Sequence, residues 1–547
     1  MPLDVSFRRA FYRPGEPVAL TVTLDALDDA TASLRLWARA SHLRETVQEV
    51  AREVSASALA HGVSLSLALP PTAPRGYGLD ISLRDAHGVL LAQHSAAFDV
   101  LNGWTEAPRY GFLSDFAPGR DDAQDTMQQL ARYHVNALQF YDWMYRHDTL
   151  LPPQELYVDP LGRALSLRTV RALIDAAHAY NMAAMPYTAV YAASPAFYEQ
   201  HPEWGLYQKD GTAHWFADGF LAYMDPRPDS GWTRHLLAQF DEVLRETAFD
   251  GIHLDQYGAP RLAYDADGHT FGLEAPLAKL IAATKEVVKA RRSDGAVVFN
   301  CVTNWPVRTA APAPQDLVYI EVWEPFVTLS DLHRLVIEAQ RLGGGKPVVL
   351  AAYIDPAWEH NMRLMDATIF ASGGARIELG EHCEVLADPY FPKHRPMTPQ
   401  VAASMRRLYD FAVRYQDVIG PRTGAGHAAY SVRVTLGNAN VGSGPGHVWP
   451  IVRQGADATA INLINLQGMP HGRWDRELDA PRTTRDVQVE VKGITGDVSA
   501  AWWASPDGNS LAPQMLEIER EQAAGGLRLS FTLPSLDYWD LIVLETV

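Results

Sequence analysis

Two carboxylates stand at the ends of strand-like runs, and their placement is the strongest chemical signal in this chain. Asp255 closes the run 249–254, and Glu321 closes the run 317–320. In a barrel of alternating strands and helices, catalytic groups gather at the carboxyl ends of the strands. Two carboxyl groups that meet there can cleave a glycosidic bond, one as proton donor and the other as nucleophile or base.

The neighbours of the two carboxylates point to different roles. Strand alternation places His253 and Tyr257 on the face of Asp255, and it places Tyr319 and Trp323 on the face of Glu321. Flanking aromatics would desolvate Glu321 and raise its pKa, which suits a proton donor. Two structural alternatives stay open, an Asp255 that caps the following turn and a Glu321 that pairs with an arginine.

Other predicted strands also end in hydrogen-bonding or aromatic side chains. Arranged around one face of a barrel, such groups would suit a neutral polyol. The predicted substrate-binding set from this pattern is Asp115, Gln139, Tyr141, Asp142, Trp143, His147, Tyr187, Tyr191, His253, Gln256, Tyr257, Asn300, Trp323, Tyr353 and Glu378. The long segment 190–229 carries nine aromatic side chains and is predicted to form either a substrate wall or a lid that packs on itself.

The elements that must position these residues alternate regularly. Strands are predicted at 110–116, 137–143, 183–189, 252–257, 297–302, 318–323, 348–353 and 376–379. Helical periodicity covers 122–133, 167–180, 231–247, 274–291, 329–342, 361–370 and 399–414. Eight strand–helix units predict a central (β/α)8 TIM barrel, with a doubly wound open sheet as the alternative.

The flanking regions have a period near two and predict a multidomain protein. Residues 1–105 are predicted to form an N-terminal immunoglobulin-like β-sandwich, and residues 106–420 the catalytic barrel. Residues 421–547 are predicted to form a C-terminal antiparallel β-sandwich, with strands at 429–436, 459–466, 486–491, 498–503, 527–532 and 541–547.

Composition narrows the class of ligand. The formal net charge of −18 and the absence of a basic stripe argue against nucleic acid and anionic membrane as partners. The two cysteines exclude disulfide stapling, and no metal or cofactor motif is found, since 265–268 is read as a solvated turn. No signal-peptide pattern precedes the first strand, so we expect a cytoplasmic protein or a trimmed secreted one. The oligomeric state stays open.

Six stretches carry a resemblance to a known family: 109–116, 133–147, 249–258, 319–324, 350–353 and 371–380. Together they resemble glycoside hydrolase family 66, the dextranases and cycloisomaltooligosaccharide glucanotransferases. The resemblance implies retaining cleavage of α-1,6-glucosidic bonds in dextran or isomalto-oligosaccharides. It assigns Asp255 as the nucleophile and Glu321 as the acid/base.

Two departures from the family pattern affect the expected activity. Arg376 stands where the family usually has His, and a guanidinium near the site would change substrate preference. Cyclising members carry a carbohydrate-binding module inserted in the barrel, and no segment between the predicted strands is long enough to hold one. We therefore expect an endo-dextranase. The alternatives are a transglycosylase or an exo-acting enzyme specific for short isomalto-oligosaccharides, and a non-catalytic α-glucan-binding protein.

Overall fold

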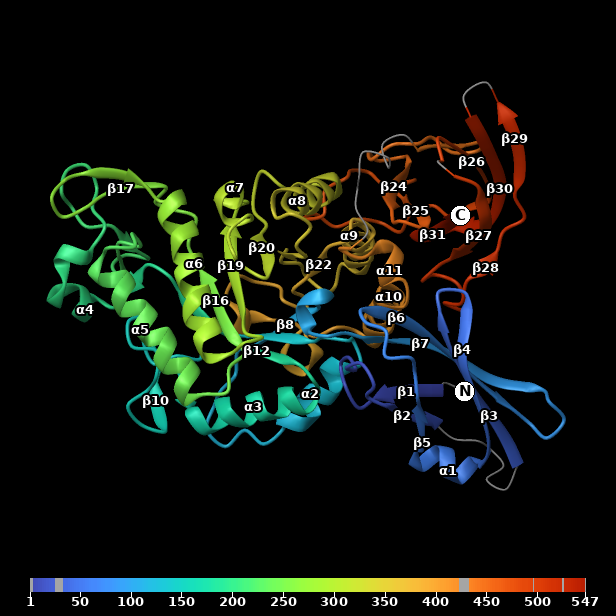
Figure 1. Ribbon diagram of the computed structural model, residues 1–547, viewed down its shortest axis with the longest axis horizontal. Coiled ribbons are helices and arrows are strands. Elements are labelled where there is room, and N and C mark those ends of the chain that lie inside the picture. The colour runs from blue at the N-terminus through green and yellow to red at the C-terminus, as the bar shows by residue number, and fades with distance from the viewer. Residues whose placement is uncertain (1–2, 25–32, 423–431, 495, 524–525, 547) are drawn as a thin grey trace.

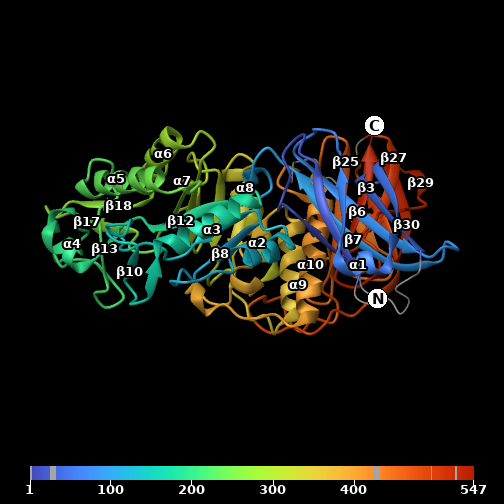
Figure 2. The ribbon, with the colours of Figure 1, turned by 90° about the horizontal axis from the view of Figure 1, so that it is seen from below.

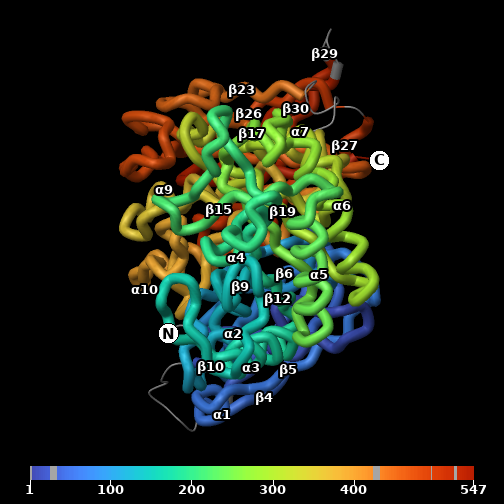
Figure 3. The backbone as a smooth tube through the Cα atoms, turned by 90° about the vertical axis from the view of Figure 1, so that its left-hand side faces the viewer, coloured from blue at the N-terminus to red at the C-terminus, as the bar shows by residue number. Residues whose placement is uncertain are grey.

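The computed structural model describes residues 3–24, 33–422, 432–494, 496–523 and 526–546. Figure 1 shows the barrel toward one end of the long axis, with the N-terminal and C-terminal sheets together at the other end. The view from below in Figure 2 shows the same division. In the tube view of Figure 3, the segment between β12 and α5 lies in front, at the end of the molecule away from both sets of sheets.

Eight parallel strands form the barrel sheet. In chain order they are β8 (Tyr110–Leu113), β9 (Ala137–Phe140), β12 (Ala183–Ala189), β16 (Gly251–Asp255), β19 (Ala296–Val302), β20 (Leu317–Glu321), β21 (Val348–Ala351) and β22 (Ala375–Arg376). Their order in space is the order in the chain, with no reversal. A doubly wound sheet requires such a reversal, so the predicted barrel is confirmed and the open-sheet alternative is wrong.

The barrel closes where the first and last strands meet. The Phe112 N–H donates a hydrogen bond of 3.1 Å to the Leu379 carbonyl, just beyond β22. Glycines make this approach possible. A Cβ on Gly111 would lie 2.6 Å from the Leu379 carbonyl oxygen, and one on Gly380 would lie 2.5 Å from the Phe112 carbonyl oxygen. Any larger residue would push the closing strands apart.

Helices cover the outside of the barrel, and all those named here except the two short ones at 307–310 and 416–419 were predicted. They are α2 (Ala123–Ala131), α3 (Leu167–Ala179), α5 (Gly231–Glu246), α6 (Glu274–Arg291), α7 (Val307–Ala310), α8 (Leu329–Leu342), α9 (Glu359–Ala371), α10 (Pro399–Arg414) and α11 (Gln416–Ile419). Side-chain caps define several beginnings. Ser166 and Ser230 each accept from the backbone three residues on, and Thr328 with Asp331 forms a capping box.

Two antiparallel sheets with one shared core form the N-terminal region. One sheet holds β1 (Leu3–Phe7), β2 (Val18–Leu24) and β5 (Val63–Leu67). The other holds β4 (Glu45–Ser55), β3 (Ser33–His42), β6 (Arg75–Arg84) and β7 (Leu90–Val100), and α1 (Ala56–His61) links the two. Alternate residues such as Val5, Leu36 and Leu79 are buried between the sheets, as the period of two predicted.

The C-terminal region also consists of two antiparallel sheets. One holds β23 (Arg433–Leu436), β26 (Thr484–Lys492), β30 (Gly526–Leu536) and β29 (Glu519–Ala523). The other holds β24 (Val448–Gln454), β25 (Ala458–Asn465), β31 (Trp539–Thr546), β27 (Val498–Ala504) and β28 (Gln514–Met515). The predicted strand at 429–436 begins among residues outside the described ranges. The multidomain fold class is confirmed, while the limits at 105 and 420 stay predictions.

Buried ion pairs fasten the N-terminal sheets to the barrel. The Arg109 guanidinium lies 2.9 Å from a carboxyl oxygen of Asp99, and Arg414 on α10 lies 3.0 Å from Asp80 on β6. Asp410 on α10 also accepts the Ala97 N–H of β7 at 2.8 Å. These contacts hold the regions in a fixed arrangement, because a buried charge without its partner would be costly. None of the helices described is both long and apolar enough to cross a membrane.

Candidate active site

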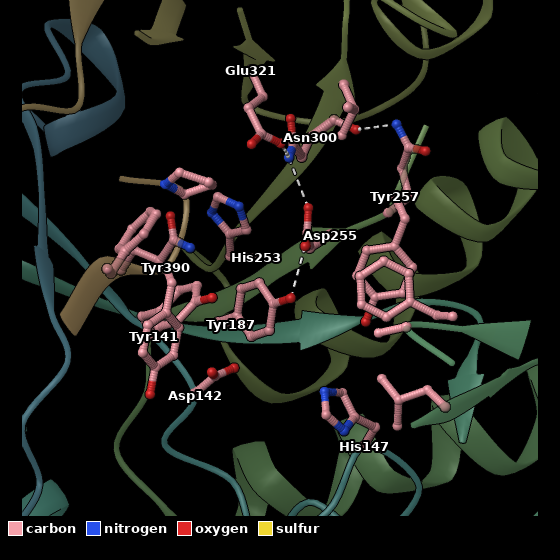
Figure 4. Close-up of a pocket in the computed structure, with 18 of the residues that line it drawn as sticks. Tyr141, Asp142, His147, Tyr187, His253, Asp255, Tyr257, Asn300, Glu321 and Tyr390 are labelled. Atoms are coloured by element: carbon pink, nitrogen blue, oxygen red, sulfur yellow. Dashed lines mark hydrogen bonds between the residues drawn. The ribbon is translucent and has the colours of Figure 1, made fainter. Parts of the chain in front are cut away.

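A pocket of about 800 Å³ opens at the carboxyl ends of the barrel strands (Figure 4). It contains thirteen of the predicted site residues: Gln139, Tyr141, Asp142, His147, Tyr187, His253, Asp255, Gln256, Tyr257, Asn300, Glu321, Trp323 and Tyr353. They come from the ends of β9, β12, β16, β19, β20 and β21 and the loops that follow. The strand-end pattern thus brings together residues that lie more than 200 positions apart.

One amide links the two carboxylates. The Asn300 Nδ2 donates to Asp255 Oδ1 at 2.7 Å and to Glu321 Oε2 at 2.9 Å. The two acceptor oxygens therefore lie at most about 5.6 Å apart. This follows from the order of the strands, because β19 lies between β16 and β20 and its Asn300 faces inward with both acids.

Each carboxylate also has a tyrosine of its own. The Tyr187 hydroxyl donates to Asp255 Oδ2 at 2.7 Å, and the Tyr353 hydroxyl donates to Glu321 Oε1 at 2.8 Å. Each of the four carboxyl oxygens of the pair thus accepts a hydrogen bond from a side chain. The geometry fixes both groups against rotation, as a site that must hold reacting atoms in place requires.

The pocket raises the pKa of both acids. Burial raises the pKa of Asp255, and the charge of Glu321 raises it further, while Asn300 and Tyr187 act in the opposite direction. Burial likewise raises the pKa of Glu321 against the hydrogen bonds from Asn300, Tyr353 and Trp323. Two acids this close titrate as a pair, and near neutral pH the pair favours one shared proton.

A neutral histidine forms the floor beneath the acids. His253 lies two residues before Asp255 on the same face of β16, and burial lowers its pKa to about 3. The Tyr110 hydroxyl lies 2.9 Å from His253 Nδ1, and the two rings stack with centroids 5.7 Å apart. The imidazole therefore adds no positive charge to the carboxylate pair.

Asp142 and His147 lie at another side of the pocket, beyond Tyr187 in Figure 4. Both side chains are more than nine-tenths buried. Burial raises the pKa of Asp142 to about 7 and lowers that of His147 to about 4. Among the described residues, no donor reaches the Asp142 carboxyl, and Arg163 donates instead to its backbone carbonyl at 3.0 Å. The Asp142 carboxyl therefore faces the pocket and is available to form hydrogen bonds with a ligand.

Aromatic side chains form the walls. Phe216 stacks on Tyr257 with centroids 4.2 Å apart, and Tyr141 stacks on Phe391 at 4.3 Å. Trp323, which is 39% exposed, stands at the rim beside Tyr353. Flat aromatic faces with a few polar groups between them suit a ligand that has both C–H and hydroxyl surfaces.

The long segment 190–229 satisfies both of its predicted descriptions. It folds into β13 (Ala192–Ala193), α4 (Pro195–Gln200), β14 (Trp215–Phe216) and β15 (Leu221–Tyr223). Phe216, Phe220 and Leu221 line the pocket. Phe197 and Trp204 instead pack against each other and against neighbouring rings. One edge is therefore a pocket wall, and the remainder is its own small core.

Five predicted site residues lie outside the pocket. Asp115 is exposed, and Trp143 is fully buried against Phe249. Tyr191 lies behind the wall, where its hydroxyl accepts from the Tyr257 N–H at 2.8 Å. Arg376 and Glu378 pair with each other on the outer side of the barrel, under α9 and α10. Arg376 does not line the pocket, so the structure gives no contact through which it would change substrate preference.

Several pocket residues were not predicted. Pro389, Tyr390 and Phe391 come from the segment after β22, and Pro160 and Leu161 come from the turn between β10 (Leu156–Val158) and β11 (Ala164–Ser166). The run Pro-Tyr-Phe-Pro at 389–392 was a usable signal, because loops after barrel strands often supply binding residues.

The turn at 265–268 has a geometry that fits its predicted solvated character. Asp265 Oδ1 accepts the His269 N–H at 2.9 Å, and Asp265 Oδ2 pairs with Arg227 at 3.0 Å. Asp267 and His269 are exposed. Although the three side chains could converge on a cation, the Arg227 contact already neutralises the central carboxylate.

Comparison with known proteins identifies the family. Residues 7–543 match the family model of Glycosyl hydrolase family 66. The chain belongs to this family. Its membership confirms the resemblance and makes the chain an enzyme of the class that hydrolyses or transfers glycosyl groups.

The relatives include both kinds of activity. A cycloisomaltooligosaccharide glucanotransferase from Niallia circulans is 24% identical over 702 aligned positions, which span 98% of this chain and 71% of the relative. A dextranase from Streptococcus salivarius is 22% identical, over 86% of this chain and 67% of the relative. A Paenibacillus cycloisomaltooligosaccharide glucanotransferase, solved in complex with cycloisomaltoheptaose, has the same fold, with a TM-score of 0.90, 22% identity and 99% of each chain covered.

Proposed function

We propose that this enzyme hydrolyses internal α-1,6-glucosidic bonds of dextran-like glucans with retention of configuration. The observation that carries the proposal is the Asn300 amide held between Asp255 and Glu321. It limits the distance between the acceptor oxygens to about 5.6 Å. Retaining glycosidases separate their two carboxyl groups by about 5–5.5 Å, whereas inverting enzymes leave room for a water between them.

In the first step, an Asp255 oxygen attacks the anomeric carbon as Glu321 gives its proton to the departing glycosidic oxygen. The bond to the leaving sugar breaks and a glycosyl ester on Asp255 forms. In the second step, Glu321 takes a proton from water, which attacks the same carbon and releases Asp255. Tyr187 and Asn300 hold the nucleophile in place by the two hydrogen bonds described above.

The shared proton explains how both roles coexist near neutral pH. The pair favours one negative charge, since burial raises the pKa of both acids and the charge of Glu321 raises that of Asp255 further. The motif places the charge on Asp255 and the proton on Glu321. Cleavage needs this arrangement, because a protonated Asp255 cannot attack and an ionised Glu321 cannot protonate the leaving group.

The pocket walls support a neutral glucan as substrate. Phe216 with Tyr257 and Tyr141 with Phe391 offer ring faces for sugar C–H surfaces. Asp142, whose carboxyl has no donor among the described residues, would accept hydroxyl groups of a bound glucose unit. His147 beside it would add a neutral hydrogen-bonding group.

The comparison with the Niallia relative favours hydrolysis over transfer, although the solved Paenibacillus glucanotransferase is matched over 99% of both chains. The alignment with the Niallia glucanotransferase runs over 702 positions, more than the 547 residues of this chain, so that relative contains stretches with no counterpart here. Between the barrel strands described, no segment holds an inserted module. Transglycosylation is the second candidate, because two of the reported relatives are named glucanotransferases.

A time course of products tests the proposal. Wild type, Asp255→Asn and Glu321→Gln would be incubated with dextran and with isomaltotriose to isomaltohexaose. Matched controls are Asp267→Asn and Glu324→Gln, which remove exposed carboxylates from neighbouring loops. We expect early mid-size fragments from dextran, lost in the two pocket variants and kept in the controls. Proton NMR should show the α-anomer as the first product.

Other outcomes would replace the proposal. Release of glucose or isomaltose alone would indicate exo action, and activity on short oligomers alone would indicate an oligosaccharide specialist. Products longer than the starting oligomer, or cyclic products, would indicate a transglycosylase. Binding of dextran with no turnover by the wild type would indicate a non-catalytic glucan-binding protein.

A further inference from the structure

The outward face of the N-terminal sheet β4-β3-β6-β7 contains a groove of about 530 Å³. Trp37 lies in it, at the middle of β3, with its side chain partly exposed. The groove belongs to the N-terminal sheets and lies at the opposite end of the long axis from the segment that walls the catalytic pocket (Figures 1 and 2). The mechanism makes no use of it.

The register of the sheet surrounds Trp37 with small side chains. Its cross-strand partners are Ala51 on β4 and Ser82 on β6, and Ser82 in turn faces Gln93 on β7. Directly opposed residues in a sheet stand side by side on one face, so small partners leave part of the large ring open, while Arg35 covers another part. Trp37 is therefore a large ring set in a row of small residues.

Charged rows border this hollow on both sides. One row runs Glu49, Arg39, Asp80 and Ser95, and the other runs Glu53, Arg35 and Arg84. Within the groove lining, Arg39 and Arg84 balance Glu49 and Asp80. Arg39 lies 3.6 Å from Asp80, and the Arg35 guanidinium lies 5.4 Å from the Trp37 ring centroid.

The far wall comes from the C-terminal region. Ser510 and Ala512 line the groove, and the Leu511 N–H lies 3.4 Å from the Ser95 hydroxyl. Arg407 on α10 donates to the Pro506 carbonyl at 2.5 Å, which ties the same loop to the barrel. The groove is thus a preformed surface between two regions and needs no ordering when a ligand binds.

We infer that this groove is a second binding site for the α-glucan chain. A lining of mixed charge, in which Asp80 also pairs with Arg414, does not select a polyion, whereas an indole ring beside fixed donors and acceptors fits a neutral polyhydroxylated ligand. A polymer held at this groove would stay near the enzyme between cleavage events, which raises its effective concentration at the catalytic pocket. The inference deepens the proposed function and rests on its substrate class.

The test uses full-length protein and measures binding and turnover separately. Binding of high-molecular-mass dextran is measured by affinity electrophoresis in the Asp255→Asn background, with and without Trp37→Ala. Turnover is measured for Trp37→Ala in the active enzyme, with dextran and with isomaltohexaose. We expect about five- to tenfold weaker retention by dextran and a similar rise in KM for dextran. The kcat/KM for isomaltohexaose should stay unchanged.

Two more variants separate loss of the ring from loss of the fold. Trp37→Phe keeps a flat ring and should keep most of the binding. Ser82→Lys fills the hollow from the next strand, leaves Trp37 in place and should weaken retention as Trp37→Ala does. Glu45→Ala, an exposed acid at the far end of β4 and outside the groove lining, is the control that should change nothing.

The outcomes distinguish this inference from the proposed function. Dextran hydrolysis with unchanged retention in Trp37→Ala and Ser82→Lys would overturn the second site alone. Retention that depends on Trp37, in a protein with no dextranase activity, would overturn the proposed function alone. Equal losses on dextran and on isomaltohexaose would also overturn the second site, because a distant groove cannot affect a substrate too short to reach it.

Discussion

Two groups of buried charged residues in the described part of the barrel differ in their access to the pocket, and this difference separates a proposed site from a structural cluster. The proposed catalytic pair, Asp255 and Glu321, faces the pocket and is held by Asn300. The outer cluster, which consists of Asp366, Arg376, Glu378 and Tyr409, is sealed between β22 and the helices α9 and α10. Both contain carboxyls with a raised pKa, at Asp255 and at Asp366.

The difference lies in charge balance and access. In the outer cluster the Arg376 guanidinium lies 3.3 Å from Asp366 and also pairs with Glu378, so a cation offsets the acids. The catalytic pair has no cation among the described residues that contact it, and neutral donors bind each oxygen. Acids left to repel each other beside an open pocket can exchange a proton with a substrate, whereas a sealed ion pair contributes to the fold.

The largest expected effect is on the catalytic pair. Asp255→Asn and Glu321→Gln should each lower kcat on dextran by about a thousandfold or more, because each removes a group that reacts in the transition state. The thermal unfolding midpoint should change little or rise. Steady-state kinetics beside a melting curve checks both, and a variant that retains a tenth of the activity would contradict the assignment.

The second effect should appear in stability alone. Arg376→Leu leaves two acids buried without their cation and should lower the free energy of unfolding by about 3–5 kcal/mol. The activity of the protein that remains folded should change less than about twofold. Arg395→Leu is the matched control, because Arg395 pairs with Asp355 at the surface and its loss should cost about 0–1 kcal/mol. A large change in kcat for the folded Arg376→Leu variant would mean that the outer cluster contributes to catalysis as well as to stability.

The third effect concerns the unpaired acid of the pocket. Burial raises the pKa of Asp142 from 3.8 to about 7, so its contribution to stability is full below about pH 4 and is lost as the pH rises to about 7. Asp142→Asn does not titrate. The free energy of unfolding of the variant should therefore increase relative to that of wild type over this pH range. Above pH 7 it should be about 2–4 kcal/mol larger, while the KM of the variant for dextran rises.

Chemical denaturation between pH 4 and 8 measures the gain in Asp142→Asn. Leu161→Ala, which removes an apolar side chain from the same pocket and no titrating group, should show a constant difference from wild type. A pH-independent difference for Asp142→Asn would mean that Asp142 has its ordinary pKa in the folded protein.

The smallest effect should separate the two members of the catalytic pair. Tyr187 lowers the pKa of Asp255, so Tyr187→Phe should move the acidic limb of the kcat/KM profile to higher pH by about half to one unit. Tyr353 lowers the pKa of Glu321, so Tyr353→Phe should move the alkaline limb to higher pH by a similar amount. Tyr141→Phe, in the same pocket, is the control. If Tyr187→Phe moved the alkaline limb and Tyr353→Phe moved the acidic limb, the roles of the two acids would have to be exchanged.

The sequence by itself determined the barrel and located the two carboxyls that are proposed to react. Eight apolar runs alternated with amphipathic ones, and the predicted helix at 274–291 is α6 as observed. Asp255 and Glu321 could be found because each is the last residue of a continuous strand, β16 or β20. Within such a strand, alternation fixes which side chains face inward.

Only the tertiary structure decided which way the side chains point in the segments beyond the strand ends. The second strand ends at Phe140, and Asp142 has a φ of 51°, so alternation no longer applies and Trp143 turns into the core while Asp142 faces the pocket. The last strand, β22, has two residues, too few to fix the face of Glu378. Tyr390 reaches the pocket from a loop whose path depends on the closed barrel. Local periodicity contains no information on such long-range contacts, and packing decides them.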